Sequence, residues 1–151
     1  MSLRIDIQRD AAAWVPSRAD IETWAALALG RRGRGELAVR VVESRESRRL
    51  NARFRGRRHP ANVLSFPAAR WPRSRDALAP LGDLVICPEV LRTEARAQHK
   101  SLRAHWAHLI VHGTLHLIGY DHRRAAQAQR MERREIAILK RLGFPNPYRS
   151  A

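Results

Sequence analysis

Residues 112–122 carry the feature that most constrains the fold: three histidines at spacings of four and six, with a glycine three residues after the second. His112 and His116 lie one above the other on one face of an α-helix, because side chains four apart are neighbours. Gly119 can end that helix in a left-handed turn at little steric cost. The chain can then swing back and bring His122 to the same point. The spacing therefore predicts a helix, a tight turn and a short return around one shared site.

The chemistry of these three side chains indicates a metal ion. Three neutral imidazoles suit a borderline-soft divalent ion and leave a fourth position open, which is typical of catalytic zinc sites, whereas structural sites close all four positions. The alternative is a cluster of hydrogen-bonded histidines, since the chain has seven. His108 extends the same stripe, but ligands on three successive turns of a straight helix lie about 6 Å apart and are too spread for one ion. We predict one zinc ion per chain, held by His112, His116 and His122. The predicted ligand set leaves out His99, His105 and His108.

The spacing also resembles the long zinc-protease motif, His-Glu-x-x-His-x-x-Gly-x-x-His. Where those proteases carry the glutamate that acts as general base, this chain has Gly113. A glycine cannot accept a proton from an attacking water. A zinc peptidase therefore stays as an alternative that Gly113 disfavours.

The net charge of +15 indicates a polyanionic partner, with RNA or DNA as the first candidate. Lys100 and Lys140 are the only lysines, so arginine supplies nearly all of the charge. Arginine suits phosphate because its planar fork bonds two oxygens at once. A GC-rich genome would explain the preference for arginine over lysine, but not the excess of base over acid. An anionic membrane surface is a weaker alternative, because no basic amphipathic helix carries the large apolar residues of an interfacial anchor.

Length and composition indicate one domain over residues 1–151, long enough to bury a single core. No run of eighteen apolar residues predicts a membrane span, and the N-terminal segment lacks a signal-peptide core. The single cysteine, Cys87, cannot form an internal disulfide, which suits a reducing compartment. We expect a cytoplasmic protein.

Hydrophobic periodicity predicts four strands and five helices. Ser17 and Asp20 resemble a capping box for a helix that ends near Gly30. Ser44 could cap a short helix whose Leu50 and Phe54 face the core. The predicted strands span 3–7, 37–42, 63–66 and 84–86. The other predicted helices span about 88–98 and 124–142, and a further one starts at about residue 102 and carries His112 and His116. Between the last two strands, the loop of residues 68–80 carries Trp71, which could stack on a base or cover the core. This order predicts an α+β fold, a small mixed four-stranded sheet with helices mainly on one face and a zincin-like metal-bearing helix.

The motif His-Gly-x-Leu-His-Leu-x-Gly-Tyr-Asp-His at residues 112–122 resembles the signature of the YbeY endoribonucleases, bacterial proteins of ribosomal RNA maturation. The resemblance covers residues 36–148. One departure is Ala61, where many members carry threonine before the asparagine or aspartate. Further matching blocks are Leu50-Asn51, Phe54-Arg55, Asn62-Val63-Leu64-Ser65-Phe66-Pro67, Leu81-Gly82-Asp83-Leu84-Val85-Ile86, Met131, Glu135, Leu139 and Pro147-Tyr148.

The resemblance implies a zinc-dependent endoribonuclease that cuts single-stranded RNA. Its expected roles are small-subunit rRNA 3′ end maturation, ribosome assembly and quality control, with the small ribosomal subunit as partner and with neither a membrane nor a small-molecule cofactor. Arg55 is the expected catalytic residue, holding the scissile phosphate; without the resemblance it would be one solvated arginine among many. Backbone phosphates are expected to contact Arg53, Arg57 and Arg58.

Two roles stay open. Asp121 could orient a histidine by accepting its other ring proton, or could stabilise the turn.

A non-catalytic RNA-binding assembly factor with a structural metal is the second alternative to the nuclease.

Overall fold

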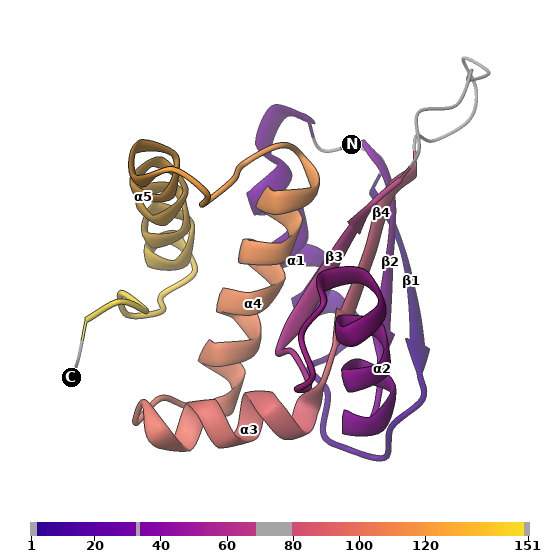
Figure 1. The fold of residues 1–151 in the computed structure, drawn as a ribbon. Coiled ribbons are helices and arrows are strands. Elements are labelled where there is room, and N and C mark those ends of the chain that lie inside the picture. Colours follow the sequence, from indigo (N-terminus) through magenta and orange to yellow (C-terminus); the bar gives the residue numbers. More distant parts are fainter. Residues whose placement is uncertain (1–2, 33, 69–79, 150–151) are drawn as a thin grey trace.

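The sheet is mixed and four-stranded, in the order β1-β2-β4-β3 (Figure 1). The computed structural model describes residues 3–32, 34–68 and 80–149. The strands are β1 (Leu3–Arg9), β2 (Gly35–Val41), β3 (Val63–Pro67) and β4 (Pro80–Ile86). β1, β2 and β4 run parallel, and β3 pairs antiparallel with β4 at the edge. The expected α+β class with four strands is confirmed, although β4 begins earlier than its apolar core suggested. Trp71 lies outside the described residues.

Five α-helices accompany the sheet in the part of the chain that the structure describes: α1 (Arg18–Leu29), α2 (Ser44–Arg55), α3 (Pro88–Ala97), α4 (Leu102–Leu117) and α5 (Ala125–Arg141). Ser17 caps α1 as expected, its Oγ accepting from the backbone N–H of Asp20 at 3.1 Å. The expected cap at Ser44 is wrong. Ser44 is the first helical residue, and its hydroxyl donates to the Glu89 carboxylate at 2.6 Å.

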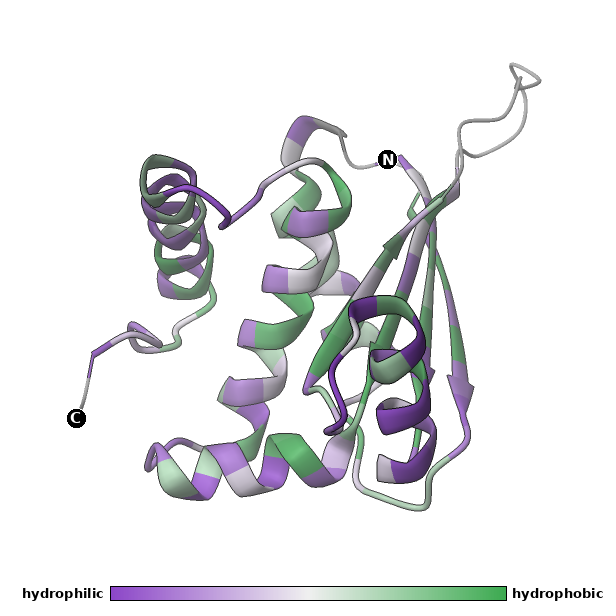
Figure 2. Cartoon of the chain, viewed as in Figure 1, coloured by the Kyte–Doolittle hydropathy of each residue, from purple (hydrophilic) through white to green (hydrophobic). Residues whose placement is uncertain are grey.

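The main core lies on the face of the sheet covered by α1 and α4, with α5 packed outside α4 (Figure 1). Both helices contribute apolar side chains to this core, whereas much of α2 and α5 is hydrophilic (Figure 2). α2 contributes Leu50 to a smaller cluster with Leu64 and Val85. Phe54 is 55% exposed, so the expectation that it faces the core is wrong. It lies at the last turn of α2, beyond this cluster, and stacks edge-on against Phe66.

Gly113 lets α4 approach the sheet closely. A Cβ at this position would lie 2.8 Å from Cδ2 of Leu84 and 3.3 Å from Oγ of Ser65. Ser65 donates to the Gly113 carbonyl at 3.3 Å, so β3 is bonded to the helix at this point. The position that holds a glutamate in zinc proteases therefore has no room for a side chain.

The end of α4 confirms the predicted turn. The Gly119 N–H bonds the His116 carbonyl, and the Tyr120 N–H bonds the Leu115 carbonyl at 3.1 Å. This pair of bonds is the Schellman ending of a helix, and Gly119 takes the required positive φ of 106°. The turn reverses the chain immediately after His116, which returns His122 toward α4.

No described helix is both long enough and apolar enough to cross a membrane.

Candidate metal centre

The three predicted histidines lie side by side at the C-terminal end of α4. The ring centroids of His112 and His116 are 6.5 Å apart, and those of His122 lie 5.9 and 5.5 Å from them. His122 is exposed and the other two rings are partly buried. Two sets of possible ligand atoms lie within 4.8 Å of one another in this arrangement: His108, His112 and Glu135, and His116, Asp121 and His122. The three predicted rings are therefore neighbours, but His112 falls in one of these sets and His116 and His122 in the other, so the ligand atoms of the three do not form one set within 4.8 Å.

One nitrogen of each helical histidine is held by the protein. Nδ1 of His112 lies 2.9 Å from the Glu135 carboxylate, and Nδ1 of His116 lies 2.7 Å from the Tyr120 carbonyl. Both oxygens accept, so in the uncharged form of either ring the proton sits on Nδ1, which donates. The lone pair is then left on Nε2, which is the form in which imidazole binds a metal. The donor set therefore fits a divalent ion.

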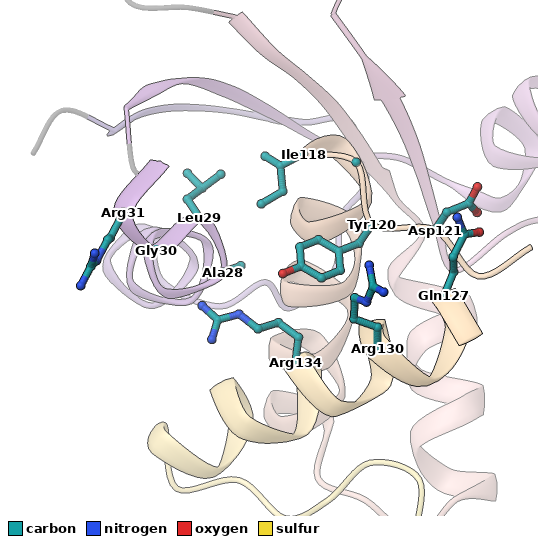
Figure 3. A pocket seen from close by; sticks show the side chains of 11 residues that line it. Ala28, Leu29, Gly30, Arg31, Ile118, Tyr120, Asp121, Gln127, Arg130 and Arg134 are labelled. Atoms are coloured by element: carbon teal, nitrogen blue, oxygen red, sulfur yellow. The ribbon is translucent and has the colours of Figure 1, made fainter. Parts of the chain in front are cut away.

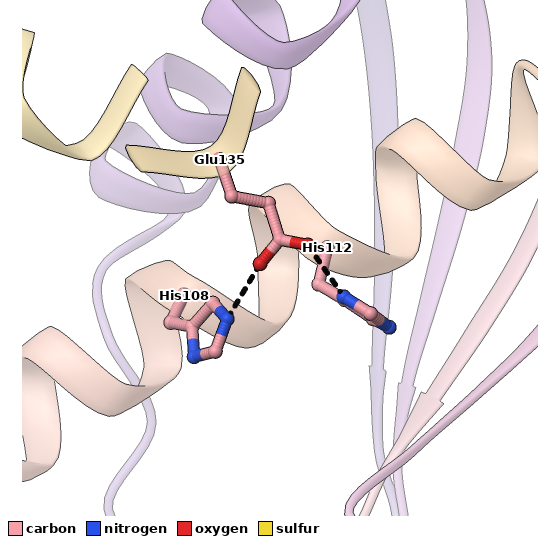
Figure 4. Close-up of side chains that lie close together, drawn as sticks. All are labelled: His108, His112 and Glu135. Atoms are coloured by element: carbon pink, nitrogen blue, oxygen red, sulfur yellow. Dashed lines mark hydrogen bonds and ion pairs between the residues drawn. The ribbon is translucent and has the colours of Figure 1, made fainter. Parts of the chain in front are cut away.

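Glu135 is the buried hub of this site (Figure 4). Its side chain is 0% exposed, and it also accepts from Nε2 of His108 at 2.6 Å and from the Tyr148 hydroxyl at 2.7 Å. Burial raises the pKa of Glu135, but the hydrogen bonds from His108 and His112 outweigh it and lower the pKa to about 2. The carboxylate is consequently ionised at neutral pH and can hold the Nδ1 proton of His112.

Two of the groups that donate to Glu135, His108 and Tyr148, have shifted pKa values. Burial lowers the pKa of His108, so this ring donates one proton without carrying a charge. Burial and the adjacent Glu135 raise the pKa of the Tyr148 hydroxyl, which stays protonated and donates. Burial also lowers the pKa of His122, with further lowering from His112 and His116, and this favours the deprotonated ligand form.

Glu135 and Tyr148 were not among the site residues predicted from the sequence. From the sequence, both were noted only as positions that match the YbeY family. The available signal was a glutamate in a stripe otherwise apolar, with Met131 before it and Ile138 after it. A buried acid on an apolar face needs a partner.

Asp121 takes the turn-stabilising role of its two alternatives. Its Oδ1 accepts from the backbone N–H groups of His122 at 2.7 Å and Arg123 at 3.2 Å. Among the described contacts it accepts no proton from a histidine ring. These bonds fix the segment that carries His122.

Arg55 lies at the end of α2, where it reaches the edge strand against which the histidine helix packs. Its guanidinium is exposed and donates one bond, to the Ser65 carbonyl at 3.2 Å. Ser65 in turn bonds Gly113, the neighbour of His112. Arg55 is therefore linked to the metal-bearing helix through one strand residue, with the rest of its guanidinium open.

The other predicted arginines lie in the last turn of α2 and in the loop that follows it. The Arg53 guanidinium lies 5.3 Å from the centroid of the Phe54 ring. Arg57 and Arg58 are exposed in the following loop. Asn51 anchors this loop from within α2, donating to the His59 carbonyl at 2.7 Å.

A pocket of about 370 Å³ opens beside His112. It is walled by His108 and Tyr148 and reaches Glu94, which accepts from His105 and from Asn62. The approach to the histidines is thus lined with hydrogen-bonding groups.

Comparison with known proteins gives one family. Residues 7–143 match the family model described as "Endoribonuclease YbeY". The chain belongs to the YbeY endoribonuclease family. This family consists of nucleases that act on RNA in rRNA processing. The solution structure of TM1509 from Thermotoga maritima is similar to the YbeY-family chain described here, with a TM-score of 0.56 and 20% identity over 93% of this chain and 91% of that one. At this identity the likeness concerns the fold.

Proposed function

We propose that this YbeY-family protein is a zinc-dependent endoribonuclease that cuts single-stranded RNA. The observation that carries the proposal is the histidine triad at the end of α4. In it, Glu135 binds Nδ1 of His112 and the Tyr120 carbonyl binds Nδ1 of His116, which leaves Nε2 of both rings free. His112, His116 and His122 are the proposed ligands of one zinc ion per chain. Three imidazoles and an open fourth position are the catalytic zinc pattern.

The chain's own residues divide the remaining work. When bound, zinc supplies Lewis-acid polarisation of a phosphoryl oxygen and activation of water. Arg55 binds the scissile phosphate and offsets the negative charge that develops on it, because its guanidinium has donors left over after the bond to Ser65. Phosphates on either side of the cut contact Arg53, Arg57 and Arg58.

The proposed substrate is ribosomal RNA, at the 3′ end of the small-subunit species, and the proposed partner is the small ribosomal subunit in the cytoplasm. Family membership supports the rRNA assignment. Contacts from arginine to phosphate carry no sequence information, so the ribosomal particle has to present the correct site. Roles in ribosome assembly and quality control follow from cutting at that point.

The peptidase alternative is opposed by the structure around Gly113. Because a Cβ there would meet Leu84 and Ser65, the glutamate base of the zinc proteases has no counterpart on this face of α4. The charge of +15 also favours a phosphodiester over a peptide substrate.

The test combines a metal count with a cleavage assay. Wild-type protein and a His116→Ala variant are purified identically, analysed for zinc, and incubated with a labelled single-stranded RNA with and without chelator. We expect one zinc per wild-type chain, cleavage that chelator abolishes and added zinc restores, and neither metal nor cleavage in the variant. The variant preparation controls for contaminating ribonucleases.

Full zinc in His116→Ala would show that the ligand assignment is wrong. Bound zinc without cleavage would instead favour the non-catalytic assembly factor with a structural metal.

A further inference from the structure

A second pocket lies on the other side of the histidine loop from Arg55. It has a volume of about 410 Å³ and opens between the end of α1, residues 118–121 and one face of α5 (Figure 3). This volume falls within the range of small-molecule sites. The residues that matter for its chemistry are Leu29, Arg31, Ile118, Tyr120, Arg130 and Arg134.

The lining of this pocket is net positive, with three arginines and one aspartate. Arg31, Arg130 and Arg134 form no ion pair with any acid in residues 3–32, 34–68 and 80–149. The one carboxylate in the lining, Asp121, already accepts from two backbone N–H groups. An anion is therefore the occupant that the charges favour.

The geometry of α5 strengthens this argument. Arg130 and Arg134 are four residues apart, so they share one helix face and repel each other. Arg134 reaches across the pocket to the end of α1, where its Nη2 lies 3.4 Å from the point at which a Cβ on Gly30 would sit. Arg134 could simply balance the negative C-terminal end of α1, whose last turn has no basic residue. That role does not explain Arg130, whose repulsion an anion between the two guanidiniums would relieve.

The aromatic and apolar side chains of the lining suit the base and ribose of a nucleotide. The Tyr120 ring projects into the pocket opposite Leu29 and Ile118 (Figure 3). An aromatic face beside arginines is how proteins hold successive nucleotides of a single strand, with the base stacked and the phosphate bonded. The pocket offers both elements side by side.

We infer that this pocket binds one nucleotide of a single-stranded RNA, with its phosphate between Arg130 and Arg134 and its base or ribose against Tyr120. The inference rests on the proposed function, which makes RNA the source of the phosphate. α5 lies on the opposite side of α4 from β3 and α2, so a strand held here and at Arg55 crosses the histidines between them (Figure 1). The same segment ties the pocket to the site, since the Tyr120 carbonyl accepts from His116.

The experiment compares two pairs of substitutions with equal charge change on the same helix. Arg130→Gln/Arg134→Gln removes the pocket arginines, and Arg133→Gln/Arg141→Gln removes two exposed arginines of α5 that line neither this pocket nor the one beside His112. Zinc-loaded protein is titrated with a fully 2′-O-methylated single-stranded RNA, which keeps every phosphate, and the length of the strand is checked on a gel afterwards. Because binding of uncut RNA is measured, the result does not depend on whether the protein cleaves RNA. Thermal unfolding of each variant confirms that the fold is intact.

The pocket pair is expected to lose about tenfold or more in affinity, since each arginine makes a charge-assisted bond. Its slope of log affinity against log salt is expected to fall by about 1.4 if two phosphate contacts are lost. The control pair should lose no more than about threefold. Tyr120→Phe keeps the aromatic ring and should bind RNA like wild type, whereas Tyr120→Ala removes the ring and should bind RNA more weakly. Both variants keep the backbone carbonyl that accepts from His116, so a difference between them reports on the ring. Equal losses in the two arginine pairs would show that the pocket is ordinary basic surface and would overturn the inference.

A second arm separates RNA from a free anion. Inorganic phosphate is titrated into ¹⁵N-labelled protein, and the amide signals of Gly30, Gly119 and Tyr120 are followed. We expect them to shift in wild type and in the control pair, but not in the pocket pair. Phosphate shifts without any effect of the pocket pair on RNA affinity would assign the pocket to a free anion, and the inference about RNA would be wrong.

Discussion

At the scale of single residues, the site depends on which atom of each side chain is already occupied. His112 and His116 each have Nδ1 bonded within the protein, and Arg55 spends one of its five N–H donors on Ser65. What remains free on each side chain is the part that can act on metal or phosphate. Two predictions follow from removing a partner or the free group.

Replacing Arg55 should separate catalysis from folding. Arg55→Ala is expected to lower RNA cleavage by about 10²–10³, the usual cost of deleting one donor to developing charge, while metal content and unfolding temperature stay at the wild-type values. Arg55→Lys should also be impaired, because lysine lacks the bidentate fork. The control is Arg48→Ala, an exposed arginine on the same helix. Wild-type turnover in Arg55→Ala, measured with the same labelled RNA, would make Arg55 an ordinary surface residue.

Replacing Glu135 should weaken metal binding although none of the three proposed metal ligands is changed. Glu135→Gln keeps the shape but removes the ionised acceptor of the His112 Nδ1 proton, and loss of such a partner typically costs about 10–100-fold in metal affinity. Competition against a chromophoric chelator measures this. Glu132→Gln carries the same charge change one turn earlier and should bind zinc like wild type. If both variants bound zinc equally well, Glu135 would have a structural role alone.

At the scale of elements, the secondary structure and the turn after α4 were largely predictable from local pattern. Ser17 caps α1 and Gly119 ends α4 as expected, because capping and left-handed turns depend on residues close in sequence. Two expectations failed where the outcome depends on distant residues. Ser44 bonds Glu89 rather than its own helix, and Phe54 stacks outside the core on Phe66. Glu135 was missed for the same reason, since its partners come from α4 and the C-terminal tail.

The close packing of α4 on the sheet should be measurable at Gly113. Gly113→Ala places a Cβ 2.8 Å from Cδ2 of Leu84, so we expect destabilisation by about 1–3 kcal/mol despite the better helix propensity of alanine. Urea unfolding of the single variant gives the value. On a Leu84→Val background, which removes the clashing atom, the same substitution should cost clearly less. A Gly113→Ala protein as stable as wild type would show that the helix has room to shift.

Acid should loosen the contact between α5 and α4 through Glu135. Its pKa is lowered from 4.5 to about 2 in the folded protein, so ionised Glu135 stabilises the fold above about pH 4.5, and this contribution is lost as the pH falls toward 2. In chelator-treated protein, the difference in unfolding free energy between wild type and Glu135→Gln should therefore be largest above pH 4.5 and shrink below it. Urea unfolding at a series of pH values tests this. A difference that does not change with pH would mean that Glu135 acts through packing rather than charge.

At the scale of the whole molecule, the positive charge is spread over surfaces on both sides of the histidines. α2 and its following loop carry Arg53, Arg55, Arg57 and Arg58, and α5 carries Arg130 and Arg134 on the other side of α4. One continuous strand of phosphates could contact both regions while crossing the metal centre. The fold itself is shared with TM1509 at 20% identity.

This distribution predicts that RNA binding depends steeply on salt and little on base identity. Each phosphate neutralised on a single strand contributes about −0.7 to the slope of log affinity against log salt, so about four to six contacts give a slope near −3 to −4. Titration of an uncut, 2′-O-methylated single strand at several salt concentrations measures it. Homopolymers of different bases should bind within a few-fold of one another, because arginine contacts to the backbone carry no sequence code. A flat salt response, or cleavage of an unstructured peptide faster than RNA, would contradict the nuclease and revive the peptidase, because a net charge of +15 predicts salt-dependent binding to a phosphate backbone.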